Sequence, residues 1–185
     1  MRGGGRYFLA LAAWLAVAAR TPVAAQTPSP RARTIAGSGV LGVHPGDTLL
    51  DTVHALQGCD LRMLPQSTAG QRGLTLRARC GGVPVDYVLN PDSHTVQRAE
   101  VRDGALSTAD GIRVGDDIAK AVDRYGRPTI ETSEGNVCAV FAPLQGMSFC
   151  LRPADARAYL ERVGSSSAPP LRGKIGSIVV FGQSR

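Results

Sequence analysis

The chain has 185 residues, enough for one ordinary domain or two small ones, and carries 21 basic against 15 acidic side chains. Three of the basic residues and none of the acidic ones lie in the first 25 residues, so the rest of the chain has a formal charge of +3. This balance argues against a dedicated nucleic-acid binder, which needs a concentrated basic stripe.

Residues 1–25 have the features of a secretory signal peptide. Arg2 and Arg6 precede an apolar run, Tyr7–Ala19, which is shorter than the ~20 residues needed to span a bilayer. Small residues at Val23-Ala24-Ala25 suit a signal peptidase, so we expect cleavage after Ala25. The prediction is a periplasmic or secreted protein with no membrane span after cleavage and, at residues 26–36, a flexible N-terminus.

A glycine-rich helix start occurs twice, at an offset of 69 residues. The first copy reads Gly42-Val43-His44-Pro45-Gly46-Asp47 and the second reads Gly111-Ile112-Arg113-Val114-Gly115-Asp116. Because the two copies are followed by similar elements, we expect an α+β fold of two tandem repeats, at residues 37–103 and 104–185. Each repeat would pack a helical segment on a small antiparallel sheet.

The helices are expected at residues 48–56 and 117–125. Asp47 or Thr48 would cap the first helix, and Asp116 with Asp117 the second. Apolar residues recur with the spacing i, i+4, i+7, which predicts one buried stripe on each helix. These residues are Leu49, Val53 and Leu56 in the first helix, and Ile118, Val122 and Tyr125 in the second.

In the first repeat, residues 73–80 and 83–89 flank Gly81-Gly82, a pair that suits a two-residue hairpin turn. Folding on that turn would place four opposed pairs on one buried face. The pairs are Cys80 with Val83, Ala78 with Val85, Leu76 with Tyr87, and Leu74 with Leu89. A third strand is expected at residues 95–102.

In the second repeat, residues 137–142 and 146–151 can pair around residues 143–145. This register puts six residues on a core face: Val137, Ala139, Phe141, Met147, Phe149 and Leu151. It also puts Cys138 opposite Cys150 on the other face. We expect a short inserted helix at residues 153–163, a loop at 164–173, and a last strand at 174–182 that is buried on both sides or covered by a neighbour.

The four cysteines are expected to form disulfides, since these persist in oxidising compartments. Four cysteines permit three pairings. We favour Cys59–Cys80 with Cys138–Cys150, one disulfide for each repeat.

The order of helix, Gly58-Cys59, variable loop, and a strand ending at Cys80 resembles the repeat of the beta-lactamase inhibitor protein family. The module is also similar to small outer-membrane assembly lipoproteins. The resemblance would cover residues 40–182. It implies tandem α/β modules, a disulfide joining Cys59 to Cys80, and a sheet face that holds another protein. Beta-lactamase inhibition itself is not expected, because Trp14 leaves with the signal peptide and no other tryptophan remains.

The outward face of the first sheet is the candidate binding surface. It would carry Thr75, Arg77, Arg79, Asp86, Arg98, Glu100 and Arg102. We single out Arg77, Arg79, Asp86, Arg98 and Arg102 as partner-binding residues, because guanidinium groups bind acidic groups in a defined geometry. The alternative is a solvated face of mixed charge that binds nothing.

Catalytic and metal-binding interpretations find little support in the sequence. His44, His54 and His94 lack the converging ligands that zinc needs, and Asp116-Asp117 is accounted for by helix capping. Neither Ser38 nor Ser93 has the pattern of a serine nucleophile. We therefore expect no metal, no cofactor and no catalytic residue.

The function expected from the sequence is that of an exported, non-enzymatic binding protein. It would dock a protein partner or another component of the cell envelope through a sheet face. The alternatives are a small periplasmic hydrolase whose site is not visible in the sequence, and a structural envelope protein.

Overall fold

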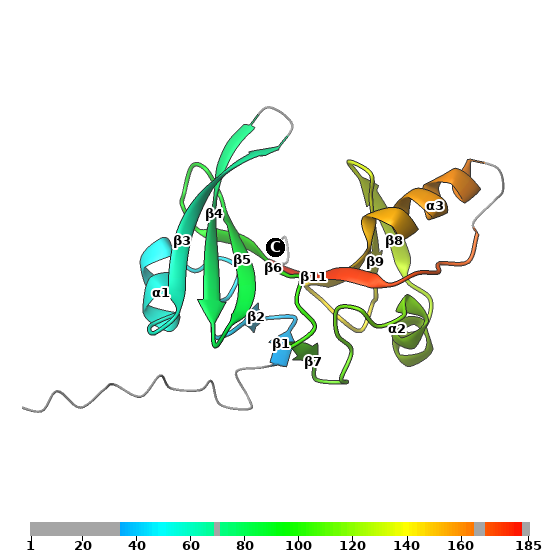
Figure 1. Cartoon of the computed structure of the whole chain (residues 1–185), viewed down its shortest axis with the longest axis horizontal. Coiled ribbons are helices and arrows are strands. Elements are labelled where there is room, and N and C mark those ends of the chain that lie inside the picture. Colours follow the sequence, from blue (N-terminus) through cyan, green and yellow to red (C-terminus); the bar gives the residue numbers. More distant parts are fainter. Residues whose placement is uncertain (1–33, 69–70, 165–168, 183–185) are drawn as a thin grey trace, which may run out of the picture.

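The computed structural model describes residues 34–68, 71–164 and 169–182 (Figure 1). The expected signal peptide and residues 26–33 of the expected flexible N-terminus lie outside these ranges, as do residues 165–168 of the expected loop. The structure differs from the expectation at residues 34–36, which form a strand. The name "first half" is used below for residues 34–103 and "second half" for residues 104–182.

The protein has an α+β fold, as predicted. The three helices are α1 (Leu49–Ala55), α2 (Ile118–Tyr125) and α3 (Pro153–Val163). The strands of the first half are β1 (Thr34–Ala36), β2 (Gly39–Val40), β3 (Asp60–Thr68), β4 (Gln71–Cys80), β5 (Val83–Leu89) and β6 (Val96–Val101). Those of the second half are β7 (Ser107–Thr108), β8 (Thr129–Ser133), β9 (Asn136–Val140), β10 (Met147–Leu151) and β11 (Ile175–Phe181).

Eight strands form one continuous antiparallel sheet in the order β3-β4-β5-β6-β11-β10-β9-β8. The prediction of a separate small sheet in each half is corrected here, because β6 pairs with β11 and joins the halves. Figure 1 shows β3 to β5 on one side and β8 with β9 on the other, with β11 crossing between them. Strands β2, β1 and β7 form a second, three-stranded sheet, in which β1 of the first half pairs with β7 of the second.

Both predicted hairpin registers are confirmed. Cys80 lies opposite Val83 across β4 and β5, and the other three expected pairs follow in the same register. In the second half Cys138 lies opposite Cys150 across β9 and β10. The two expected disulfides, Cys59–Cys80 and Cys138–Cys150, are both present.

Two edge strands were not predicted from the sequence. β3 covers the segment taken as a variable loop, and it pairs along its length with β4. Pro65 lies within β3 and cannot donate to a strand ladder, which is tolerated at a sheet edge. β8 is short, mostly exposed and without strict alternation, so its sequence carries little strand signal.

The core lies on the face of the large sheet that the helices and the small sheet cover. Figure 1 shows α1 beside β3 of the first half, and α2 and α3 beside β8 and β9 of the second half. All six residues expected on the core face of the second hairpin are buried. The phenol of buried Tyr87 donates to the carbonyl of Val40 at 3.0 Å, which ties β5 to the small sheet.

Three burial predictions need correction. Val53 is exposed and its place in the α1 stripe is taken by Thr52, whose hydroxyl donates to the carbonyl of Thr48. Leu74 is exposed although its partner Leu89 is buried. Strand β11 buries Ile178 and Val180 on the core face only, while the alternate residues reach the opposite face.

The helix starts have the same geometry in both halves. Gly46 and Gly115 have φ of 96° and 93°, a backbone conformation that favours glycine. The amide of Gly46 donates to the carbonyl of Val96, and that of Gly115 to the carbonyl of Ile175. Each turn thereby joins the start of a helix to the last strand of its own half.

Candidate binding surface

The face of the large sheet opposite the helices is mostly polar, although Leu64, Val88, Val140 and Val179 also lie on it, and the described residues place no helix or strand over it. We call it the open face. It carries, from β3 to β8, Arg62, Thr75, Arg77, Arg79, Asp86, Val88, Arg98, Glu100, Arg102, Ser177, Val179, Phe181, Ser148, Cys150, Cys138, Asn136, Glu131 and Ser133. All five predicted partner-binding residues lie on this face.

A groove of about 700 Å³ is hollowed in the open face between the two halves. Its lining comes from β6, β11, β10, β9 and β8 and from the turn between β8 and β9. Arg98 and Arg102 line it, whereas Arg77, Arg79 and Asp86 lie beside it on β4 and β5. The structure therefore brings only two of the five predicted residues into the groove.

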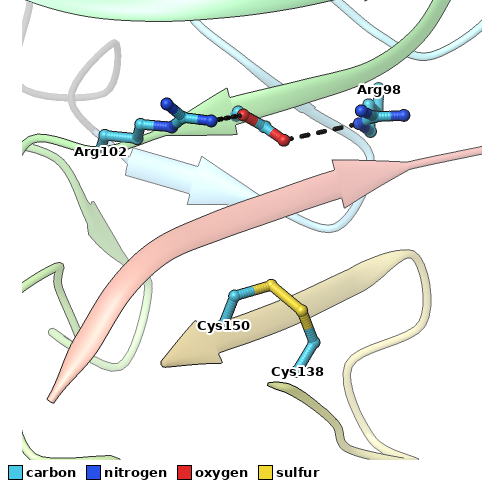
Figure 2. The surroundings of a disulfide bond; sticks show 5 residues. Arg98, Arg102, Cys138 and Cys150 are labelled. Atoms are coloured by element: carbon cyan, nitrogen blue, oxygen red, sulfur yellow. Dashed lines mark hydrogen bonds and ion pairs between the residues drawn. A yellow bond between two sulfur atoms is a disulfide. The ribbon is translucent and has the colours of Figure 1, made fainter. Parts of the chain in front are cut away.

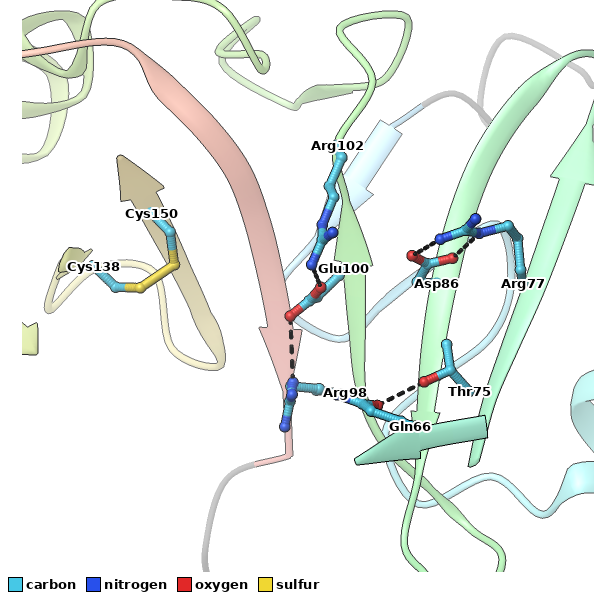
Figure 3. Close-up of polar contacts among 9 residues, drawn as sticks. All are labelled: Gln66, Thr75, Arg77, Asp86, Arg98, Glu100, Arg102, Cys138 and Cys150. Atoms are coloured by element: carbon cyan, nitrogen blue, oxygen red, sulfur yellow. Dashed lines mark hydrogen bonds and ion pairs between the residues drawn. A yellow bond between two sulfur atoms is a disulfide. The ribbon is translucent and has the colours of Figure 1, made fainter. Parts of the chain in front are cut away.

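Arg77 and Asp86 form a two-pronged ion pair across β4 and β5 (Figure 3). The guanidinium Nε and Nη2 donate to the two carboxylate oxygens at 2.6 and 2.8 Å. The hydrogen bond to Asp86 and the attraction of its charge raise the pKa of Arg77. Because these donors and both oxygens of Asp86 bind each other, this bidentate pair links β4 to β5 and leaves little free charge for a partner.

Glu100 on β6 lies between two arginines (Figure 3). Arg102 donates to Oε2 of Glu100 at 2.6 Å, and Nε of Arg98 lies 3.6 Å from Oε1. The side chain of Arg102 is 63% exposed, while that of Glu100 is 17% exposed. Two guanidinium groups share one carboxylate, so this edge of the groove keeps one positive charge in excess.

The opposite edge of the groove is acidic, and no local pattern in the sequence predicts it. Glu131 on β8 and Glu134 in the β8–β9 turn line the groove. Neither forms an ion pair with any residue in the described part of the chain. β8 was not predicted as a strand from the sequence. The position of these two residues across a groove from Arg102 therefore follows only from the strand order.

The floor of the groove is largely uncharged. Ser148, Ser177 and Val179 contribute to it, together with the Cys138–Cys150 disulfide. Figure 2 shows this disulfide facing the same side of the sheet as Arg98 and Arg102, with β11 running between them. The disulfide therefore lines the groove of the candidate surface, whereas Cys80 of the other disulfide is part of the core.

The acidic and hydroxyl residues at the two helix starts have structural roles. Asp47 accepts from the amide of His44, and Asp116 in the same way from the amide of Arg113. Thr48 and Asp117 cap α1 and α2. Among the described residues, no three histidine, cysteine, aspartate or glutamate side chains are placed to hold a metal ion.

Other features bear on compartment. Disulfides are typical of proteins outside the reducing cytosol, and this chain has two. Within residues 34–68, 71–164 and 169–182, no helix is long and apolar enough to cross a membrane.

Comparison with known proteins identifies a structural neighbour but no function. No protein-family model matches the chain, and no curated protein matches it. The crystal structure of the uncharacterized protein YfeY from Escherichia coli matches with a TM-score of 0.55. The match covers 80% of this chain and 99% of that chain at 14% sequence identity. At this identity the similarity is one of fold alone.

Proposed function

We propose that the protein is an exported, non-enzymatic binding protein that docks a protein partner of the cell envelope on the open face. One observation carries the proposal: the open face is hollowed into a polar groove, while the three helices and the small sheet all cover the opposite face. A sheet face without a covering layer, shaped as a groove, suits the recognition of another molecule.

Export is supported by the chemistry of the cysteines. All four are paired in disulfides, which form and persist in oxidising compartments such as the periplasm or the extracellular medium. The charged start and short apolar run at residues 1–25 support the same proposal.

We further propose that the two halves are tandem α/β repeats that share one continuous sheet. The support is a repeated set of backbone contacts. Val96 donates to the carbonyl of Asp47 and accepts from Gly46, and Ile175 makes the equivalent bonds with Asp116 and Gly115. The strand order, in which the second half mirrors the first around the β6–β11 pair, supports the same division.

Photo-crosslinking in the native envelope tests the docking proposal. A photoreactive residue replaces Gln97 or Ser133, two exposed positions that line the groove, and in a control it replaces Asp123 on α2. We expect the same protein adduct from both groove positions and none from the control. A further variant, Ser177→Tyr, fills the groove floor and should abolish the adduct. An adduct that forms equally from Asp123, or that survives Ser177→Tyr, would contradict docking in the groove.

A further inference from the structure

We infer that the groove binds an extended protein segment with an acidic side chain at one end and a basic side chain at the other. The inference rests on the proposed docking function and adds the chemistry of the partner. It follows from the opposite charges of the two edges of the groove.

The β6 edge selects an acidic group. Glu100 neutralises one of the two arginines beside it, and Arg102 remains the more exposed of the two, with 63% of its side chain exposed against 32% for Arg98. An incoming carboxylate can therefore bind the free donors of Arg102 without breaking the existing contact to Glu100. Guanidinium groups present several donors in one plane, so a second carboxylate is well accommodated.

The β8 edge selects a basic group. Glu131 and Glu134 place two carboxylates there, and the groove lining on this side includes no lysine or arginine. A lysine or arginine of a partner would gain two acidic neighbours at this edge. The same cation placed at the β6 edge would meet the excess positive charge, so the groove favours one orientation of a dipolar segment.

The distance between the edges sets the length of the segment. Four strand spacings separate β6 from β8, which amounts to roughly 19 Å along the sheet. An extended chain advances about 3.3 Å per residue, so about six residues cross the groove. The uncharged floor of serines, Val179 and the disulfide suits the small or polar residues between the two charges.

Selection from a random peptide library tests this chemistry, because it does not require the partner to be identified first. The probe is a phage-displayed library of twelve-residue peptides, and the target is the exported, oxidised protein. We expect the enriched peptides to carry an acidic and a basic residue about six positions apart. Arg102→Gln should remove the requirement for the acidic residue, and Glu131→Gln with Glu134→Gln the requirement for the basic one. Each change should weaken the best peptide about tenfold.

Matched controls separate charge from folding. Arg157→Gln on α3 and Asp123→Asn on α2 remove the same kinds of charge from exposed positions outside the groove, and should leave peptide binding unchanged. Glu134→Asn is a further groove variant, chosen to remove the charge without destabilising the fold. Glu134 has φ of 49° in a two-residue turn, a conformation in which asparagine is preferred. This variant should bind the peptide more weakly while its melting temperature stays equal or rises, which excludes unfolding as the cause.

The outcomes distinguish the inference from the proposed function. Two results would overturn the dipolar segment and leave docking in the groove intact. One is that the enriched peptides lack the charge pattern. The other is that they bind both sets of charge variants as well as the unmodified protein but no longer bind Ser177→Tyr. No enrichment above an empty surface would overturn both.

Discussion

The two halves of the protein cross-link their central hairpins differently at corresponding places on the open face. In the first half, Arg77 on β4 lies opposite Asp86 on β5 and forms a two-pronged ion pair. In the second half, Cys138 on β9 lies opposite Cys150 on β10 and forms a disulfide. Both pairs are cross-strand neighbours, but one is ionic and the other covalent.

The lengths of the hairpins explain the difference. β4 and β5 have 10 and 7 residues and are joined by the two-residue turn Gly81-Gly82. β9 and β10 have 5 residues each, with residues 141–146 between them. A short hairpin with a longer loop gains less from its own ladder and loses more entropy on loop closure, so a covalent link stabilises it more usefully. The first half places its disulfide instead between Cys59, just after α1, and the end of β4.

Removing the disulfides should have the largest effect on stability. The sequence separations are 21 residues for Cys59–Cys80 and 12 for Cys138–Cys150. Loop-closure entropy predicts losses of about 3.3 and about 2.8 kcal/mol for the respective double Cys→Ser variants. Chemical denaturation of each variant measures the loss. If the Cys138–Cys150 variant lost less than about 1 kcal/mol, the short hairpin would not need its covalent link.

Replacing the paired turn glycines should have the next largest effect and tests whether the halves are equivalent. Gly46→Ala and Gly115→Ala each force a side chain into the left-handed region, at a cost of about 1–2 kcal/mol. Gly164→Ala is the control, because Gly164 has φ of −64° and alanine is tolerated there. Equal losses of stability in thermal or chemical unfolding would support the equivalence of the two turns. A large loss of stability at only one glycine would contradict it.

Removing one arginine from each ion-pair group should have a smaller effect, with a clear order. Arg77→Gln leaves Asp86, whose side chain is 12% exposed, without its two charged hydrogen bonds, at a cost of about 1–2 kcal/mol. Arg102→Gln removes an exposed partner while Glu100 keeps Arg98 nearby, so the cost should be under about 0.5 kcal/mol. Denaturation midpoints measure both. The reverse order would show that Arg102, not Arg77, is the structural arginine of the open face.

Acid dependence should be the smallest effect and is located in the second half. Burial works to raise the pKa of Asp116, but the hydrogen bonds and charges of Lys120 and Arg113 outweigh it, so the pKa is lowered on folding. The unfolded chain then binds the proton more readily, so this stabilisation is complete above about pH 4 and is lost as pH falls through the lowered pKa. Asp116→Asn should flatten the fall in melting temperature below pH 4, and the free energy of unfolding involved is less than about 1 kcal/mol. An unchanged acid profile would contradict this role.

Local patterns predicted the hairpins correctly because their signals are contained in short stretches. The Gly81-Gly82 turn fixes the register of β4 and β5, and alternation does the same for β9 and β10. The edge strands lacked such signals: β3 contains Pro65 and β8 has five mostly exposed residues. Their pairing depends on a neighbouring strand that supplies a ladder, which is a tertiary condition.

The candidate site was predicted only in its first half for the same reason. Arg98 and Arg102 could be placed on one face from the alternation of residues 95–102 alone. Glu131 and Glu134 could not be related to them, because about thirty residues separate the two pairs in the chain. Pairing of β6 with β11 brings them across one groove.

By itself, the sequence determined the α+β composition, the helix starts, the two hairpins and the Cys138–Cys150 pairing, since each depends on turn residues and alternation within a short stretch. Only the tertiary structure decided that the strands form one sheet, that the helices all cover one face, and that a groove with oppositely charged edges is left on the other. These features depend on strand order, and strand order is set by which apolar faces can be buried together across the whole chain.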